Sequence, residues 1–109
     1  MKYYKDDGEI SIDGRKAVDI PLQVALQEVD NLPAEDVYDG NFIGFTNEKG
    51  ETIQFIRREQ ESWFMDVPVR ENGKIHSLHE TDLITEKVQD VVKKFFLGED
   101  WRSLCNLKK

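Results

Sequence analysis

The chain has 109 residues, of which 39% are hydrophobic and 34% are charged, and its formal net charge is −7. This length fits one domain over residues 1–109 with one hydrophobic core. No apolar run approaches the roughly 20 residues of a membrane-spanning helix, and we expect neither a membrane partner nor a signal peptide. Cys105 is the only cysteine, which excludes an internal disulfide framework and favours a cytoplasmic protein.

The charge is unevenly distributed. Residues 1–40 contain ten acidic and four basic side chains, so nearly all the excess acid precedes residue 41. An acidic surface repels phosphate backbones, and we therefore expect no nucleic-acid partner. It favours a basic protein partner instead, because opposite electric fields raise the rate of encounter.

The first forty residues predict one helix. Residues 10–12 are typical of a short strand, and Asp19 then serves as an N-cap candidate, with Pro21 in the first turn. Apolar residues recur with helical spacing at Leu22, Ala25, Leu26 and Val29. Asn31 and Pro33 end the helix. The segment that follows predicts a surface loop, in which residues 36–38 form a short strand at most.

Residues 41–78 predict an antiparallel meander. Four runs rich in aromatic and β-branched residues are separated by polar turns, two of which contain Gly50 and Gly73. Along residues 62–69 Trp63 and Met65 fall on one face, while Phe64 and Asp66 fall on the other. Pro68 cannot donate to a ladder, which predicts a free edge or the end of the strand there.

A second amphipathic helix follows the meander. Thr81 or Thr85 opens it, and Gly98 is a suitable residue for its C-terminal cap. Its apolar positions repeat at Ile84, Val88, Val91, Val92 and Phe95.

These elements predict an α+β domain: an antiparallel β-meander of about four to five strands with two amphipathic helices packed on one face. A βαβ arrangement stays open if an early strand pairs beside the meander. The expected core consists of Leu22, Leu26, Ile43, Phe45, Ile53, Phe55, Trp63, Met65, Val88, Val91, Val92 and Phe95. We also expect Trp101 to pack in the core rather than to anchor a partner.

The sequence carries no complete catalytic motif. His76 and His79 are its only histidines, and on a strand residues at this spacing face opposite sides, so we expect no metal site. Glu59 and Glu61 indicate a solvated turn rather than an acid–base pair. Arg57 and Arg58 form a basic doublet on a mixed surface. No phosphate-binding loop is present, and we expect neither a cofactor nor an enzyme.

A cluster of acidic residues is the one feature of the sequence that indicates a possible binding function. Two members lie on the predicted outer side of the first helix and three on the following loop: Glu28, Asp30, Glu35, Asp36 and Asp39. A plain solubilising surface is one interpretation, and a docking surface for a cationic protein is the other. The open face of the meander, with Gln54, Phe64 and Asp66, is the next candidate for a partner-binding surface.

The order of elements resembles a known family. An amphipathic helix near residue 20, a Gly-containing meander, and a helix ending in Phe95, Phe96 and Gly98 with Trp101 just beyond resemble the small immunity proteins of bacterial polymorphic toxin systems. The most similar group accompanies deaminase and nuclease toxins. The resemblance implies a non-enzymatic cytoplasmic inhibitor that covers the active site of one cognate toxin. It assigns no functional residue by position.

We therefore hypothesise an immunity-type protein that binds and neutralises a basic toxin. Two alternatives stay open at this point. One is a small enzyme that uses His76 or His79, and the other is an adaptor or structural subunit of a larger assembly.

Overall fold

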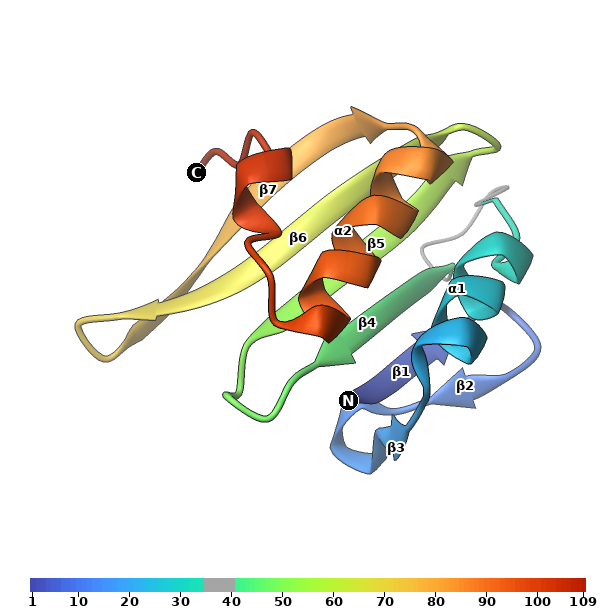
Figure 1. Cartoon of the computed structure of the whole chain (residues 1–109), viewed down its shortest axis with the longest axis horizontal. Helices are drawn as coiled ribbons and strands as arrows, with labels where there is room; N and C mark the ends of the chain where they lie inside the picture. Colours follow the sequence, from blue (N-terminus) through green and yellow to red (C-terminus); the bar gives the residue numbers. More distant parts are fainter. Residues whose placement is uncertain (35–40) are drawn as a thin grey trace.

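A computed structural model of the chain describes residues 1–34 and 41–109 (Figure 1). Its strands are β1 (Lys2–Asp6), β2 (Ser11–Ile12), β3 (Val18–Asp19), β4 (Phe42–Thr46), β5 (Thr52–Glu59), β6 (Ser62–Glu71) and β7 (Lys74–Leu83). The helices are α1 (Leu22–Asn31) and α2 (Thr85–Leu97), with short 3-10 helices at Gly14–Lys16 and Arg102–Leu104. These described strands form one seven-stranded sheet, and both α-helices cover the same face of it. The predicted α+β class is confirmed.

The four strands of the predicted meander form the centre and one edge of the sheet. Antiparallel hairpins join β4 to β5, β5 to β6 and β6 to β7. Gly50 (φ 82°) and Gly73 (φ 77°) adopt the left-handed conformation in two of the turns, which glycine tolerates without strain. β6 and β7 continue beyond Asp66, the last residue of β6 that pairs with β5. Among the described strands Pro68 therefore has a neighbour on one side only, which confirms the expected free edge.

β1 and β3 are the described strands that the sequence did not predict. β1 pairs with β4 on one side and with β2 and β3 on the other, always antiparallel. β3 and β4 are therefore parallel to each other, with β1 between them and α1 as their connection. This split βαβ unit is the arrangement that the sequence leaves open. The inward residues of β1 are Tyr3 and Lys5, and the lysine interrupts the apolar alternation expected of a strand.

The hydrophobic core lies between the sheet and the two helices. The ten predicted core residues from the sheet and α2 are buried, and Leu22 and Leu26 of α1 are half-buried against them. Trp63 is fully buried. Trp101 is 5% exposed, and its ring lies edge-on to that of Phe95 at 5.7 Å between centroids. Both tryptophans therefore belong to the core.

The starts of both helices differ from the predictions. Asp19 is not the N-cap of α1, because its pairing with Lys2 of β1 places it two residues before Pro21, which occupies the cap position. α2 begins at Thr85, one of the two predicted starts, so Ile84 is its N-cap and is 51% exposed rather than part of the predicted apolar face. α2 ends at Leu97, and Gly98, with φ 70°, is its C-terminal cap, as predicted.

Candidate functional site

Two members of the predicted acidic cluster lie in the described part of the chain, and they differ. Glu28 does not project outward: its carboxylate faces the sheet and accepts a hydrogen bond of 2.9 Å from Lys5 Nζ. Lys5 is 8% exposed, and a buried ammonium is strongly unfavourable without a counter-ion, which explains the inward turn of Glu28. Asp30 is exposed in the last turn of α1.

The other predicted members, Glu35, Asp36 and Asp39, lie outside the described residues. So does the strand considered for residues 36–38. Their role in binding a partner stays a prediction.

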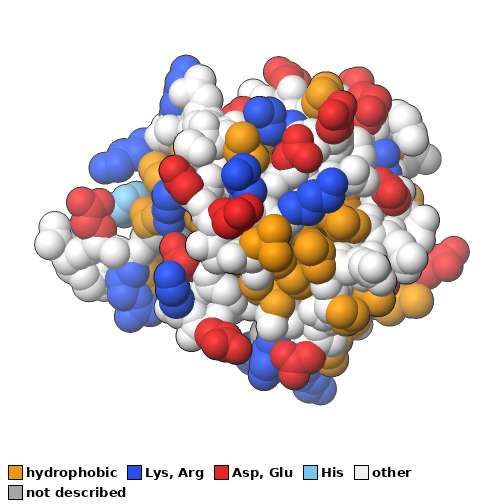
Figure 2. All heavy atoms as spheres, viewed as in Figure 1, with side chains coloured by type: hydrophobic (Ala, Val, Ile, Leu, Met, Phe, Trp, Pro, Cys, Tyr) orange, Lys and Arg blue, Asp and Glu red, His pale blue; other side chains and the backbone are white. Residues whose placement is uncertain are grey.

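Asp30 instead joins acidic residues that come from distant parts of the sequence. Six exposed carboxylates form what we call the acidic end: Asp30, Glu59, Glu61, Asp82, Glu86 and Asp90. Gln89 of α2 donates a hydrogen bond to the Asp30 carboxylate, and Ser62 Oγ donates to Asp82 over 3.2 Å. The Glu61 carboxylate accepts the backbone N–H of Thr85 at 3.4 Å. These contacts connect α1, the β5–β6 turn, the end of β7 and the start of α2. Figure 2 shows acidic side chains, with Lys and Arg side chains among them, along the upper edge of this view, where these elements lie in Figure 1.

Arg57 lies beneath the acidic end and forms hydrogen bonds with two of the segments that compose it. Its side chain is buried, and its guanidinium donates to the carbonyl oxygens of Asp30 at 3.1 Å, Leu32 at 2.7 Å and Gln60 at 2.9 Å. The first two carbonyls belong to the C-terminus of α1, where helix carbonyls lack partners and a cation is favoured. Arg57 therefore ties α1 to the β5–β6 turn, and the surface role suggested by its place in a basic doublet is wrong.

A polar row crosses the face of the sheet that the helices leave open. The strand register places these residues side by side on β1, β4, β5, β6 and β7: Tyr4, Gly44, Gln54, Asp66 and His79. The Tyr4 hydroxyl donates to Gln54 Oε1 at 2.6 Å, and Gln54 Nε2 donates to Asp66 Oδ2 at 2.5 Å. His79 Nδ1 lies 3.2 Å from Asp66 Oδ1. Neither of these two atoms makes a hydrogen bond within the described residues, so Gln54 is the group that holds the Asp66 carboxylate in the row.

Gly44 allows Tyr4 to cross β4 and reach Gln54. A Cβ atom at position 44 would lie 2.1 Å from Tyr4 Cζ, so the tyrosine ring covers the glycine directly. The ring also packs edge-on against Phe42, with 6.2 Å between centroids. The polar row therefore depends on the absence of a side chain at this one position.

We predict that Gly44→Ala lowers the free energy of unfolding by about 1–3 kcal/mol, because the added methyl group displaces the Tyr4 ring. In a Tyr4→Ala background the same substitution should cost much less, since the clash is gone. Urea denaturation of the four proteins in this cycle measures both costs. Equal costs in the two backgrounds would rule out the close packing of Tyr4 on Gly44.

The open face also contains a shallow depression of about 460 Å³ beside the polar row. Its lining consists of Phe42, Gln54, Ile56, Phe64, Asp66, Ser77 and His79. It brings together Gln54, Phe64 and Asp66, the three residues that the sequence assigned to the open face. The side chain of Asp66 is 17% exposed and that of His79 is 42% exposed, so the imidazole is the more accessible group.

The environment of Tyr4 changes its acidity. Burial raises the pKa of its phenol to about 12, and the negative charge of Asp66 adds to the increase. Because the folded state holds this proton more firmly than the unfolded chain, the stabilising contribution is complete below pH 10 and is lost as the pH rises from about 10 to about 12.

We predict that Asp66→Asn lowers the pKa of Tyr4, since it removes a negative charge that opposes phenolate formation. An ultraviolet absorbance titration measures this pKa, and the transition that disappears in Tyr4→Phe identifies the residue. Glu86→Gln, at the acidic end, is the matched control and should leave the pKa unchanged. The proposed coupling is wrong if Asp66→Asn also leaves it unchanged.

The remaining reactive groups do not form a second site. His76 pairs with Glu71 at 3.2 Å, and the register places it on the opposite face of β7 from His79, as predicted. Cys105 is half-buried, and burial raises the pKa of its thiol to about 11. Within residues 1–34 and 41–109, no group of three or more His, Cys, Asp and Glu residues could hold a metal ion.

Neither helix in the described part of the chain is long and apolar enough to cross a membrane.

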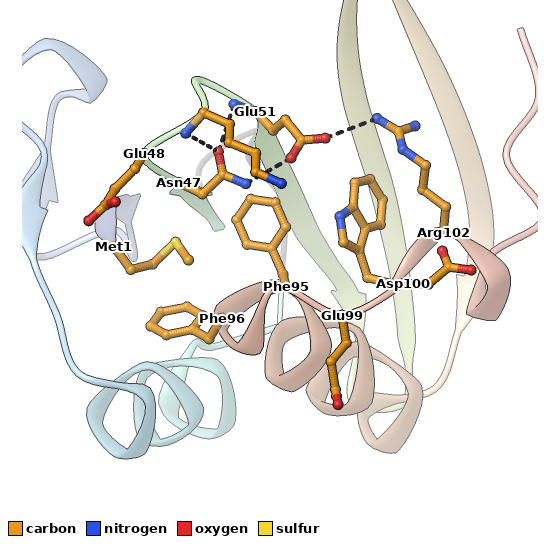
Figure 3. A pocket seen from close by; sticks show the side chains of 12 residues that line it. Met1, Asn47, Glu48, Glu51, Phe95, Phe96, Glu99, Asp100 and Arg102 are labelled. Carbon is orange, nitrogen blue, oxygen red and sulfur yellow. Dashed lines mark hydrogen bonds and ion pairs between the residues drawn. The ribbon is translucent and has the colours of Figure 1, made fainter.

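A larger hollow of about 630 Å³ lies between the β4–β5 turn and the C-terminal end of α2 (Figure 3). Phe95 and Trp101, which contribute to its lining, belong to the core. On its rim Glu51 accepts a hydrogen bond of 2.9 Å from Asn47 and lies 3.7 Å from Arg102. Because the rim carries paired charges of both signs, it selects neither an anion nor a cation.

Comparison of the chain with protein-family models, with curated sequences and with solved structures found no match.

Proposed function

We propose that this protein binds a basic protein partner through the acidic end and covers part of that partner's surface. The proposal rests on one observation: six exposed carboxylates from four separate segments form the acidic end. The buried Arg57 side chain holds two of these segments together by hydrogen bonds to their carbonyl oxygens. Electrostatic attraction between such a surface and a basic cleft accelerates encounter and orients the two proteins.

Three basic residues lie near the acidic end. Arg57 is buried beneath it. Arg58 is exposed on β5 next to Glu59, and Lys87 lies on α2 next to Glu86. The six carboxylates outnumber these three basic side chains, so this surface carries an excess of negative charge.

The biological role that we propose is immunity to a cognate toxin. The support for this role is the resemblance to immunity proteins, which rests on an amphipathic helix, a meander and a second helix with Gly98 and Trp101 just beyond it. Such an inhibitor works in the cytoplasm by steric and electrostatic occlusion of a basic active-site cleft. It needs no catalytic group of its own, because it acts only by remaining bound.

The test is co-expression with the protein encoded directly upstream of the gene. We expect that protein to be a basic toxin that arrests growth alone, and wild-type protein to restore growth. The variant Asp30→Asn/Glu86→Gln/Asp90→Asn should restore it less well at equal abundance. A metabolic enzyme in the upstream position, or no binding between the two purified proteins, would overturn the proposal.

The Asp66–His79 pair favours a second candidate function, a small hydrolase. A carboxylate that is hydrogen-bonded to Nδ1 orients an imidazole to accept a proton at Nε2. Asp66 Oδ1 lies 3.2 Å from His79 Nδ1, although the two atoms do not form a hydrogen bond, and Ser77 lines the same depression. Within the described residues, however, Ser77 makes no hydrogen bond to His79, so the nucleophile–base contact is missing. Loss of a measurable esterase activity in His76→Ala/His79→Ala, with circular dichroism unchanged, would favour the enzyme over the binding protein.

A further inference from the structure

The depression on the open face adjoins the acidic end along β5 and β6. Ile56 and Phe64 pair across these strands and lie three residues from Glu59 and Glu61, respectively. Three residues of strand span roughly 10 Å. A partner seated on the acidic end therefore lies within reach of the depression with one long side chain.

Asp66 gives the depression its charge. It is the only residue of the described lining with a formal charge at neutral pH when His79 is neutral. Its Oδ1 atom is shielded from solvent near His79 and makes no hydrogen bond, so the 17% exposure of the side chain belongs to Cβ, Cγ and Oδ2 together. Oδ2 accepts one hydrogen bond from Gln54, and a carboxylate oxygen can accept a second.

The Asp66 carboxylate is held in place before any ligand arrives. Gln54 donates to it, and the Tyr4 hydroxyl fixes Gln54 in turn. A charged group that is already oriented loses little conformational entropy on binding, so more of its interaction energy appears as affinity.

The lining of the depression is suited to a side chain that has an aliphatic stem and a planar cationic head group. Phe42 and Phe64 flank Ile56 in one cross-strand row, which forms an apolar floor with an aromatic ring on each side. A guanidinium stacks readily on aromatic rings. The chain already provides an example, because the Arg58 guanidinium lies 5.6 Å from the centroid of Phe64 without lining the depression.

We propose that the depression receives the side chain of an arginine from the basic partner. Its guanidinium meets Asp66 Oδ2, and its aliphatic stem lies between Phe42 and Phe64. The volume of about 460 Å³ falls within the roughly 300–1,000 Å³ of small-ligand pockets. This inference rests on the proposed function, since it names the anchor residue of the same partner. Desolvated arginines surrounded by aromatic residues are frequent binding hot spots.

The test uses the isolated protein and a small probe, so that it does not depend on the partner. Full-length ¹⁵N-labelled protein is titrated with N-acetyl-arginine amide and, separately, with N-acetyl-citrulline amide, which has a similar shape but no charge. We expect weak, saturable shifts of the Phe42, Ile56, Phe64 and Asp66 amide signals with the arginine probe. The affinity of Asp66→Asn for this probe should fall about tenfold.

Asp90→Asn removes the same charge from the acidic end and should bind the arginine probe like wild type. Melting temperatures and the dispersion of the amide spectra check that each variant is folded. Equal binding of arginine and citrulline, or unchanged binding by Asp66→Asn, would overturn the inference. Neither result affects partner binding through the acidic end, which the co-expression experiment tests separately.

Discussion

Replacing Phe55 by alanine should lower the free energy of unfolding by about 3–5 kcal/mol. Phe55 is fully buried in β5, between Ile43 of β4 and Met65 of β6 in the register of the sheet. Its ring lies edge-on to that of Trp63 at 6.5 Å between centroids. A cavity at this point cannot be filled by collapse, because strands on both sides hold its neighbours in place.

Urea denaturation measures this effect, and Ile75→Ala is the matched control. Ile75 is 65% exposed, and its truncation should change stability by less than about 0.5 kcal/mol. Similar effects of the two substitutions would mean that the assignment of the two sheet faces is reversed.

Replacing Arg57 by alanine should cost roughly 3–5 kcal/mol, because it removes the donor of the buried Leu32 carbonyl and of the partly buried Asp30 carbonyl and leaves the Gln60 carbonyl with Thr85 Oγ1 as its side-chain donor. The substitution also removes the guanidinium that lies 4.9 Å from the centroid of the Trp63 ring. We expect the C-terminus of α1 to loosen first, and amide hydrogen exchange there should rise before exchange in β5 and β6 does.

Arg57→Lys distinguishes the geometry of the guanidinium from its charge. A lysine keeps the positive charge but cannot direct donors to several carbonyls in a fixed plane, so most of the loss should persist. Arg70→Ala, at an exposed position of β6, is the control and should be nearly neutral. Full stability of Arg57→Lys would show that charge alone explains the role of Arg57.

The sequence predicts the meander and α2 well because their patterns are strong and local. Apolar residues alternate along β5 and β6, glycines mark the turns, and α2 repeats its apolar positions up to Gly98. The sequence does not predict β1, because Lys5 occupies one of its inward positions and interrupts the apolar alternation expected of a strand. Its partner Glu28 lies on α1, and no local pattern shows that the two will neutralise each other across the core.

The candidate site is predictable only in part. Asp30 is recognisable as an exposed acidic residue at a helix end, but the other members of the acidic end come from the β5–β6 turn, the end of β7 and α2. Tertiary contacts join these segments, namely Gln89 to Asp30, Ser62 to Asp82 and Thr85 to Glu61. The polar row on the open face requires the register of five strands and a glycine at position 44, neither of which a linear pattern contains.

Docking through the acidic end can be measured by association kinetics with the purified upstream-encoded protein. Wild-type protein and Asp30→Asn/Glu86→Gln/Asp90→Asn are mixed with it by stopped flow at about 20 mM and about 150 mM salt, where screening differs strongly. We expect the triple variant to associate about tenfold more slowly at low salt and with a flatter salt dependence, while its stability is nearly unchanged. A control variant, Glu9→Gln/Glu48→Gln, which alters carboxylates outside the acidic end, should associate almost as fast as wild type. Association of the triple variant at the wild-type rate in low salt would contradict the assignment of the acidic end as the docking surface.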